Sequence, residues 1–253
     1  MKSLLLKDDW MSNALGKPSY SFRYYEGYTE ETINSYLNKC ASGSFVSVKI
    51  PTQDVASSIK FQNAGFRIVD TLIEHKRLIN SNYDSLQNNS SMVDGLKIRK
   101  AVNSDAEAVG ALAKESFYLS RFHLDPEISN ETACNIKQNW SLNFFNGSRG
   151  DEMFIAELCP EESKSSEIVG FILIKYGIQN SAPKKFFIDL IAVDKAYKRM
   201  GIAKLLIDQL LISLEDNQMV LVGTQAANIP ANKLYQGMGF SISDSQFVLH
   251  YHN

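Results

Sequence analysis

The chain of 253 residues is long enough for one large or two modest domains, and 44% of its residues are hydrophobic. Its formal net charge of -2 gives no basis for binding nucleic acid or a membrane surface. Three cysteines, spaced unlike metal ligands, indicate free thiols in a reducing compartment. No apolar run approaches the ~20 residues of a spanning helix, so we expect a cytoplasmic protein without signal peptide or membrane anchor.

The first third of the chain predicts a small α/β domain with a linker, residues 1–90, that ends in the polar segment 80–91. Residues 59–66 and the strand expected over 67–78 repeat the pattern of residues 233–240 and the strand after them. Phe61 then stands where Tyr235 does, without a hydroxyl group. The repeat is either a common helix–glycine–strand design or a decayed half-domain, with a structural or substrate-shaping role.

Residues 91–253 predict a second domain in which strands and helices are mixed. A strand over 96–100 comes first, and a helix capped by Asn103 or Ser104 then runs to Phe117. The remaining elements are a helix over 129–145, strands over 153–158, 168–176 and 186–193, a helix over 201–214, a strand over 219–222, a helix that carries Tyr235, and a strand over 240–251.

The stretch from Ile191 to Leu206 holds the strongest motif, in which an apolar strand meets a basic loop and a helix opened by Gly201. The first N–H groups of a helix have no partner within the helix, and the helix dipole adds partial positive charge there. The loop is therefore suited to a phosphate or pyrophosphate group. A second motif follows, with Asn228 at the start of the short Tyr235 helix and Gly239-Phe240 after it.

Together the two motifs resemble the acyl-CoA-binding core of the GNAT superfamily of N-acetyltransferases. Lys198, Gly201 and Ala203 stand at the family's loop positions, where the first is usually arginine or glutamine. The resemblance implies an α/β (α+β) GNAT fold with a mixed, mostly antiparallel sheet and acetyl-CoA as cosubstrate. The family usually ends with two strands after the glycine–phenylalanine pair, whereas this chain has one. We expect an N-terminal strand, or one from a second subunit, to pair with that strand.

The resemblance also implies which residues hold the cosubstrate. The backbone of one strand would pair with the pantetheine arm, and Asn228 would bind this arm from the opposite side. The strand residues are Ile191, Ala192 and Val193, and the pyrophosphate loop consists of Lys198, Arg199, Met200, Gly201, Ile202, Ala203 and Lys204.

Tyr235 is the candidate general acid, because a phenol with a pKa of about 10 is protonated at neutral pH and close in acidity to a thiol. The alternative is a core aromatic residue on an amphipathic helix. Cys134 and Cys159 have no histidine paired with them in the sequence, so no acyl-cysteine step is implied. His250 and His252 alone make a poor metal site, and we expect no metal.

For the acceptor amine, the loop 119–126 offers Arg121 and His123, which either contact an anionic or polar group or serve local packing. The two-part layout, the Ser120-Arg121-Phe122 loop and Thr224-Gln225 are similar to the dTDP-fucosamine acetyltransferase family. This resemblance implies acetylation of a nucleotide-linked 4-amino-4,6-dideoxyhexose for surface polysaccharide synthesis, with a possible homodimer. Asp189 would orient or deprotonate the amine, or be a polar residue at the cleft mouth.

Two other functions fit the same motifs. One is N-acetylation of a protein N-terminus or another small amine, since the same core serves these acceptors. The other is a non-catalytic CoA-binding regulatory module, against which the presence of Asn228 and Tyr235 argues.

Overall fold

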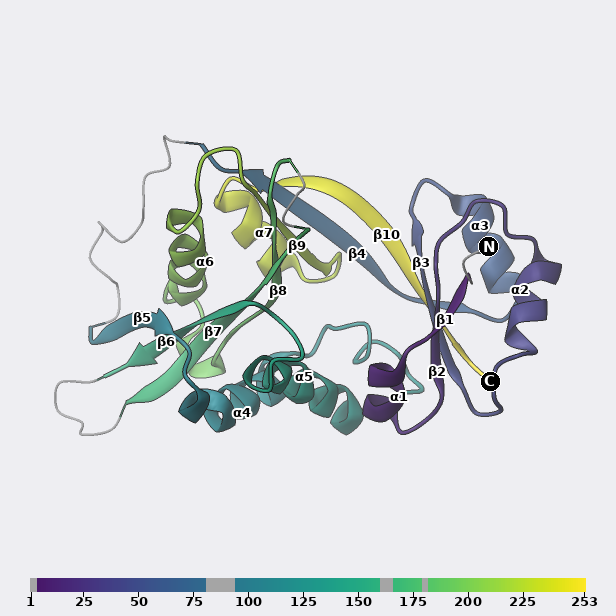
Figure 1. Cartoon of the computed structure of the whole chain (residues 1–253), viewed down its shortest axis with the longest axis horizontal. Coiled ribbons are helices and arrows are strands. Elements are labelled where there is room, and N and C mark those ends of the chain that lie inside the picture. The colour runs from purple at the N-terminus through teal and green to yellow at the C-terminus, as the bar shows by residue number, and fades with distance from the viewer. Residues whose placement is uncertain (1–3, 81–93, 160–165, 179–181) are drawn as a thin grey trace.

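The computed structural model describes residues 4–80, 94–159, 166–178 and 182–253 (Figure 1). Most of the predicted linker, and the boundary at residue 90, lie outside these residues. Over the described ranges the strands are β1 (Leu5–Lys7), β2 (Ser19–Phe22), β3 (Phe45–Pro51), β4 (Arg67–Leu78), β5 (Leu96–Lys100), β6 (Glu152–Leu158), β7 (Glu167–Tyr176), β8 (Lys185–Val193), β9 (Met219–Gln225) and β10 (Ser241–His252). The helices are α1 (Asp9–Leu15), α2 (Glu30–Leu37), α3 (Val55–Asn63), α4 (Ala106–Ser116), α5 (Asn130–Phe145), α6 (Ile202–Ile212) and α7 (Ile229–Gly237).

All of these strands join one sheet in the order β1-β2-β3-β10-β4-β9-β8-β7-β6-β5. The β2–β3 and β8–β9 pairs are parallel and the other neighbours are antiparallel, as predicted for a mixed, mostly antiparallel sheet. From β5 onward the order of strand, two helices, three strands, helix, strand, helix and strand is confirmed. None of the described helices combines the length and the apolar composition needed to cross a bilayer.

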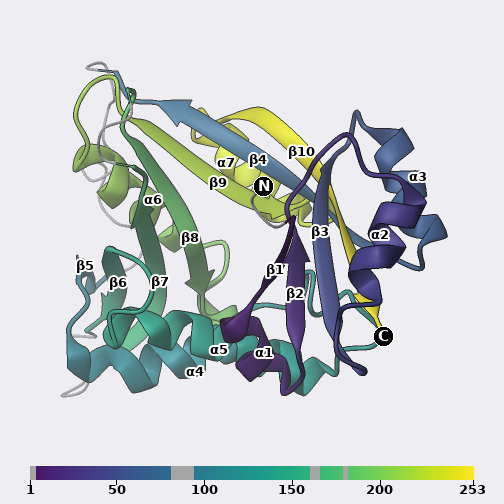
Figure 2. The same cartoon turned by 45° about the vertical axis from the view of Figure 1, so that its right-hand side comes forward.

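The closing strand β10 lies between β3 and β4, so the prediction that an N-terminal strand pairs with it is confirmed. Its last residues, 246–252, pair with β3, while β4 extends the other way to pair with β9 over residues 72–78. Figures 1 and 2 show these two long strands side by side between the two ends of the molecule. The two halves thus exchange strands: β10, which follows α7, pairs with β3, and β4, which follows α3, pairs with β9.

The faint sequence repeat corresponds to a repeat of structure. The series β2-α2-β3-α3-β4 has the same order as β8-α6-β9-α7-β10, with a parallel first pair in both. Phe61 of α3 and Tyr235 of α7 occupy matching places, and each is buried in the apolar cluster of its own half. Residues 19–78 thus repeat the order of elements of residues 185–252, an arrangement that both the common local design and the decayed half-domain would produce.

Helices cover both faces of the β5–β9 part of the sheet. Successive strand residues point to opposite faces of the sheet and so belong to two different cores. Phe154 and Ile172 pack with α6, whereas Ile155 and Phe171 pack with α4. The predicted cap of α4 at Asn103 or Ser104 is wrong. The Asp105 carboxylate, which is paired with Arg99 at 2.8 Å, accepts the Val102 N–H and fixes a short 3₁₀ turn before α4.

A buried carboxylate anchors β10 to the loop between α4 and α5. One oxygen of Asp125 accepts hydrogen bonds from His250 Nδ1 at 2.7 Å and His252 Nε2 at 2.8 Å, and the other accepts the Glu127 N–H. Potential metal ligands of all three side chains lie within 4.8 Å of one another. The Lys17 ammonium can only donate to His252 Nδ1, at 3.0 Å, which puts the His252 proton on Nε2. Hydrogen bonding therefore accounts for the cluster.

Replacing Asp125 with alanine should lower the free energy of unfolding by about 3 kcal/mol, because buried donors on His250 and His252 lose their acceptor. The measurement is urea unfolding. Glu127→Ala removes a neighbouring acid whose ion pair with Arg67 is exposed, and we expect a change below about 0.5 kcal/mol. Equal losses for the two variants would contradict the anchoring role.

Candidate active site

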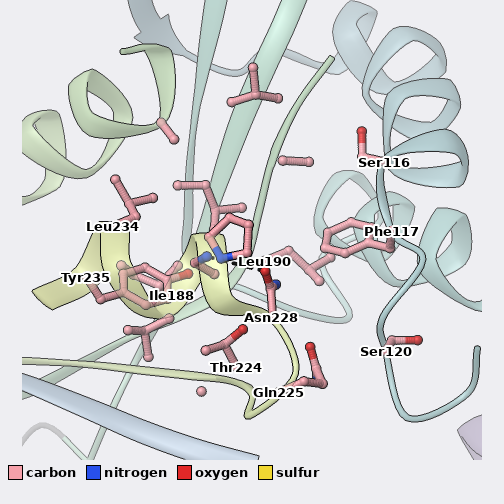
Figure 3. Close-up of a pocket in the computed structure, with 18 of the residues that line it drawn as sticks. Ser116, Phe117, Ser120, Ile188, Leu190, Thr224, Gln225, Asn228, Leu234 and Tyr235 are labelled. Carbon is pink, nitrogen blue, oxygen red and sulfur yellow. Dashed lines mark hydrogen bonds between the residues drawn. The ribbon is translucent and has the colours of Figure 1, made fainter. Parts of the chain in front are cut away.

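The site begins where two parallel strands part. β8 pairs with β9 only from Lys185 to Ile188, and beyond this point β8 remains paired with β7 and β9 with β4. Asp189 is the extra residue of a β-bulge between β8 and β7, which bends the strand at this place. The opening is a cleft of about 440 Å³, with α7 on one side and the segment after α4 on the other (Figure 3).

Most of the predicted site residues meet in this cleft. Its wall contains Ile191, Ala192, Val193, Lys198, Arg199, Ala203, Asn228 and Tyr235, together with Asp189, Thr224 and Gln225. Gly201, Ile202 and Lys204 line an adjoining hollow that shares Lys198 and Arg199 with it. Neither wall includes Met200, which is exposed, and the cleft wall includes Ser120 in place of Arg121 and His123.

The turn before α6 leaves backbone donors directed at one place. Gly201 is the N-cap with a φ of 83°, in the left-handed region that glycine favours, and no side chain caps the helix. The N–H groups of the first helical turn have no acceptor within the helix. Arg199 is also left-handed, with a φ of 67°. This turn fits a pyrophosphate, since Lys198, Arg199 and Lys204 add positive charge around uncapped amides.

Tyr235 faces the cleft from α7 with only 3% of its surface exposed. Asn228 caps this helix by accepting the Ala231 N–H at 3.3 Å, and the Phe240 N–H bonds to the Tyr235 carbonyl where the helix ends. Burial raises the pKa of the phenol, which keeps it protonated at neutral pH. No residue in the described part of the chain hydrogen bonds to its hydroxyl group. The hydroxyl group is therefore free to donate to a ligand.

Asp189 has a full set of donors. Arg149 approaches its two oxygens at 2.6 and 2.7 Å, and Trp140 Nε1 donates to one of them at 2.7 Å. These three hydrogen bonds fix the position of the carboxylate and occupy both of its oxygens. The arrangement fits the second reading of Asp189, a fixed polar group at the cleft mouth, better than proton abstraction.

The segment between α4 and α5 forms the far wall, with Ser116, Phe117, Ser120 and Lys137. His123 lies behind this wall, where its Nδ1 is 2.6 Å from Ser120 Oγ. Its Nε2 is 3.7 Å from Cys134 Sγ, so the expectation that Cys134 has no histidine beside it is wrong. Cys134 itself is absent from the cleft wall.

Sequence reasoning missed Lys137 and Arg149. Lys137 follows Ala133 and precedes Trp140 at helical spacing, on the buried side of α5. A lysine at such a position is a signal, because lysine is almost never fully buried without a reason. The role of Arg149 could not be predicted in this way, because Arg149 and Asp189 are 40 residues apart in the chain and meet only in the folded protein.

A family model described as "Acetyltransferase (GNAT) family" matches residues 114–240, which include the turn, the cleft and Tyr235. The spore coat polysaccharide biosynthesis protein SpsD of Bacillus subtilis (strain 168) is 32% identical over 148 residues, 58% of this chain and 47% of that protein. N-alpha-acetyltransferase 30 of Xenopus laevis is 28% identical over 99 residues, 38% of this chain and 36% of that protein. The matched regions thus span about half and about a third of these relatives.

Solved structures share the fold over almost the whole chain. A tandem GNAT protein from the clavulanic acid biosynthesis pathway has a TM-score of 0.60 at 11% identity, with 94% of this chain and 76% of that chain covered. A GCN5-related N-acetyltransferase from Sphaerobacter thermophilus has a TM-score of 0.56 at 14% identity, with 93% and 72% covered. At these identities the likeness concerns the fold alone.

Replacing Gly201 with alanine should weaken binding of coenzyme A about fivefold, because the left-handed backbone that aims the amides becomes strained by about 1 kcal/mol. Isothermal titration calorimetry measures the effect. Gly147→Ala is the matched control, since Gly147 has a φ of 74° and open space around it, outside the cleft wall. An equal loss of affinity in both variants would attribute the effect to general destabilisation.

Proposed function

The chain belongs to the acetyltransferase (GNAT) family, and from that premise we propose that it transfers acetyl from acetyl-CoA to the amine of a nucleotide-linked amino-deoxy sugar. The observation that supports transfer is the buried phenol of Tyr235, with an unpartnered hydroxyl group beside the opening between β8 and β9. The relation to a spore coat polysaccharide biosynthesis protein supports a sugar acceptor. A dTDP-4-amino-4,6-dideoxyhexose, used for surface polysaccharide, is the proposed class.

In this proposal the cosubstrate supplies an activated acetyl thioester, and the chain supplies the groups that hold it. The amides of the turn from Arg199 to Lys204 bind the pyrophosphate. The β8 segment from Asp189 to Val193 has no strand partner on its β9 side, so its backbone groups are free to pair with the pantetheine arm. A backbone N–H of Ile191, Ala192 or Val193 would stabilise the negative oxygen of the reacting carbonyl.

The neutral amine attacks the thioester carbonyl carbon, and the C–S bond breaks as the new amide forms. Tyr235 donates its proton to the departing thiolate, and the proton that the amine nitrogen loses to solvent replaces the one given up by the phenol. Burial keeps the phenol protonated, and its position in the cleft wall brings the hydroxyl group to the same opening as β8. General-acid catalysis of this kind contributes roughly 100- to 10,000-fold. Asp189, held by Arg149 and Trp140, fixes the cleft mouth, while Ser120, Thr224 and Gln225 face the acceptor.

A second acceptor class is a protein N-terminus. The match to N-alpha-acetyltransferase 30 favours it, although this match covers less of the chain than the match to SpsD. A non-catalytic CoA-binding module is the third possibility, and the free Tyr235 hydroxyl group argues against it.

Tyr235→Phe should retain coenzyme A affinity within about twofold and lose roughly 100-fold or more in kcat, because the ring still packs but cannot donate a proton. Steady-state thiol release with a reactive acceptor measures kcat. Tyr24→Phe is the control, because the Tyr24 hydroxyl bonds to Asp54 at 2.8 Å and Tyr24 lines neither the cleft nor the adjoining hollow. Unchanged turnover in Tyr235→Phe would remove the assignment.

The function itself is tested by thiol release from acetyl-CoA with a panel of dTDP- and UDP-linked amino sugars, N-terminal peptides and polyamines. We expect turnover with at least one nucleotide amino sugar and product mass increased by one acetyl group. Turnover with peptides alone would reject the sugar acceptor. Binding of coenzyme A without turnover on any amine would favour the regulatory module.

A further inference from the structure

The acceptor end of the cleft holds a buried cation that has no anionic partner. Lys137 lies in the wall with 8% of its surface exposed. Its ammonium group makes no hydrogen bond or ion pair within the described ranges, and the contacts it has are with two aromatic rings. These are Phe117 and Trp140, whose ring centroids lie 4.8 and 4.6 Å from Nζ.

Such a position is unfavourable for a lysine in the free protein. Removing an ammonium group from water costs free energy that ring faces recover only in part. Asp189 attracts the Lys137 ammonium group, but its carboxylate is already paired with Arg149. Burial lowers the pKa of Lys137 to about 8, and repulsion from Arg121 adds to this.

Further positive charge surrounds Lys137. Arg121 of the α4–α5 loop repels both Lys137 of α5 and Lys49 of β3, and Asp70 and Glu74 attract Lys49. None of the three forms an ion pair among the described residues, although Asp8 and Asp70 attract Arg121 from a greater distance. Among the three, Lys137 alone lines the cleft, and its ammonium group has no ion-pair partner among the described residues.

We infer that Lys137 binds a phosphate of the acceptor, and that Arg121 and Lys49 raise the affinity through their charge. This inference rests on the proposed function and identifies the diphosphate of the nucleotide sugar as the group recognised. An ammonium group that is desolvated in advance forms a strong charge-assisted hydrogen bond with such an oxygen. The cleft then has two phosphate sites, one for each substrate.

Binding at the proposed anion site can be measured separately from binding at the Gly201 turn if the turn is first saturated. The protein is loaded with coenzyme A, which occupies the turn at Gly201, and is then titrated calorimetrically with dTDP, UDP, thymidine and uridine. We expect at least one diphosphate to bind. Lys137→Met should weaken its binding about 10- to 100-fold, because a charge-assisted hydrogen bond is lost while the stem still packs. Binding of the uncharged nucleosides and of coenzyme A should stay unchanged.

Lys97→Met is the matched control, since Lys97 is an exposed residue of the edge strand β5, and we expect wild-type affinity for the diphosphate. If Lys137→Met loses coenzyme A affinity and is therefore misfolded, Arg121→Gln serves as the second variant. We expect it to weaken diphosphate binding two- to fivefold. Failure of both diphosphates to bind the wild-type protein would overturn the inference. Affinity within twofold of wild type in a folded Lys137→Met variant, or in Arg121→Gln if Lys137→Met does not fold, would also overturn it.

Failure of the anion site and failure of the proposed function would give different results. If no nucleotide amino sugar is acetylated, loss of diphosphate binding in Lys137→Met still supports the anion site. If a nucleotide amino sugar is acetylated with the same KM by wild type and Lys137→Met, the proposed function stands and the anion site is rejected.

Discussion

The site depends on the separation of β8 from β9 after Ile188. Up to this residue the two strands satisfy each other's backbone groups, and beyond it neither strand has the other as a partner. The bulge at Asp189 turns β8 away, and hydrogen bonds from Trp140 and Arg149 hold the bulge residue in place. Unpaired backbone groups are normally costly in a protein interior. Here they border a cleft, where a ligand with an amide-containing arm can pair with them.

The internal repeat explains why only one half offers this site. Both halves place a helix after a strand, at α2 and at α6. At the start of α2 the Thr29 side chain accepts the Thr32 N–H, and Glu30 and Glu31 place negative charge against the positive end of the helix dipole. The start of α6 has Gly201 without a side-chain cap and no acid in its first turn. One helix start therefore carries two acids, whereas the other leaves uncapped amides without acidic neighbours in its first turn.

Local features of the site could be predicted from the sequence. The Gly201 turn and the Asn228–Tyr235–Gly239 helix depend on residues close together in the chain, and the order of elements from β5 to β10 follows from hydrophobic periodicity. The wrong cap at Asn103 or Ser104 shows the limit, because the capping carboxylate of Asp105 is held by Arg99, which in turn bonds to Glu157 on the distant strand β6. The bond between Arg149 and Asp189 and the burial of Lys137 arise from packing between distant segments. No local pattern determines these contacts.

The exchange of β4 and β10 between the two ends of the sheet has a consequence for how the chain is made. During synthesis, β3 emerges from the ribosome nearly two hundred residues before the strand that completes its hydrogen bonds. Until residues 241–252 have emerged, one edge of β3 and one edge of β4 are both open. Closure of the sheet therefore waits for β10, and loss of this one strand would leave both ends of the sheet incomplete at once.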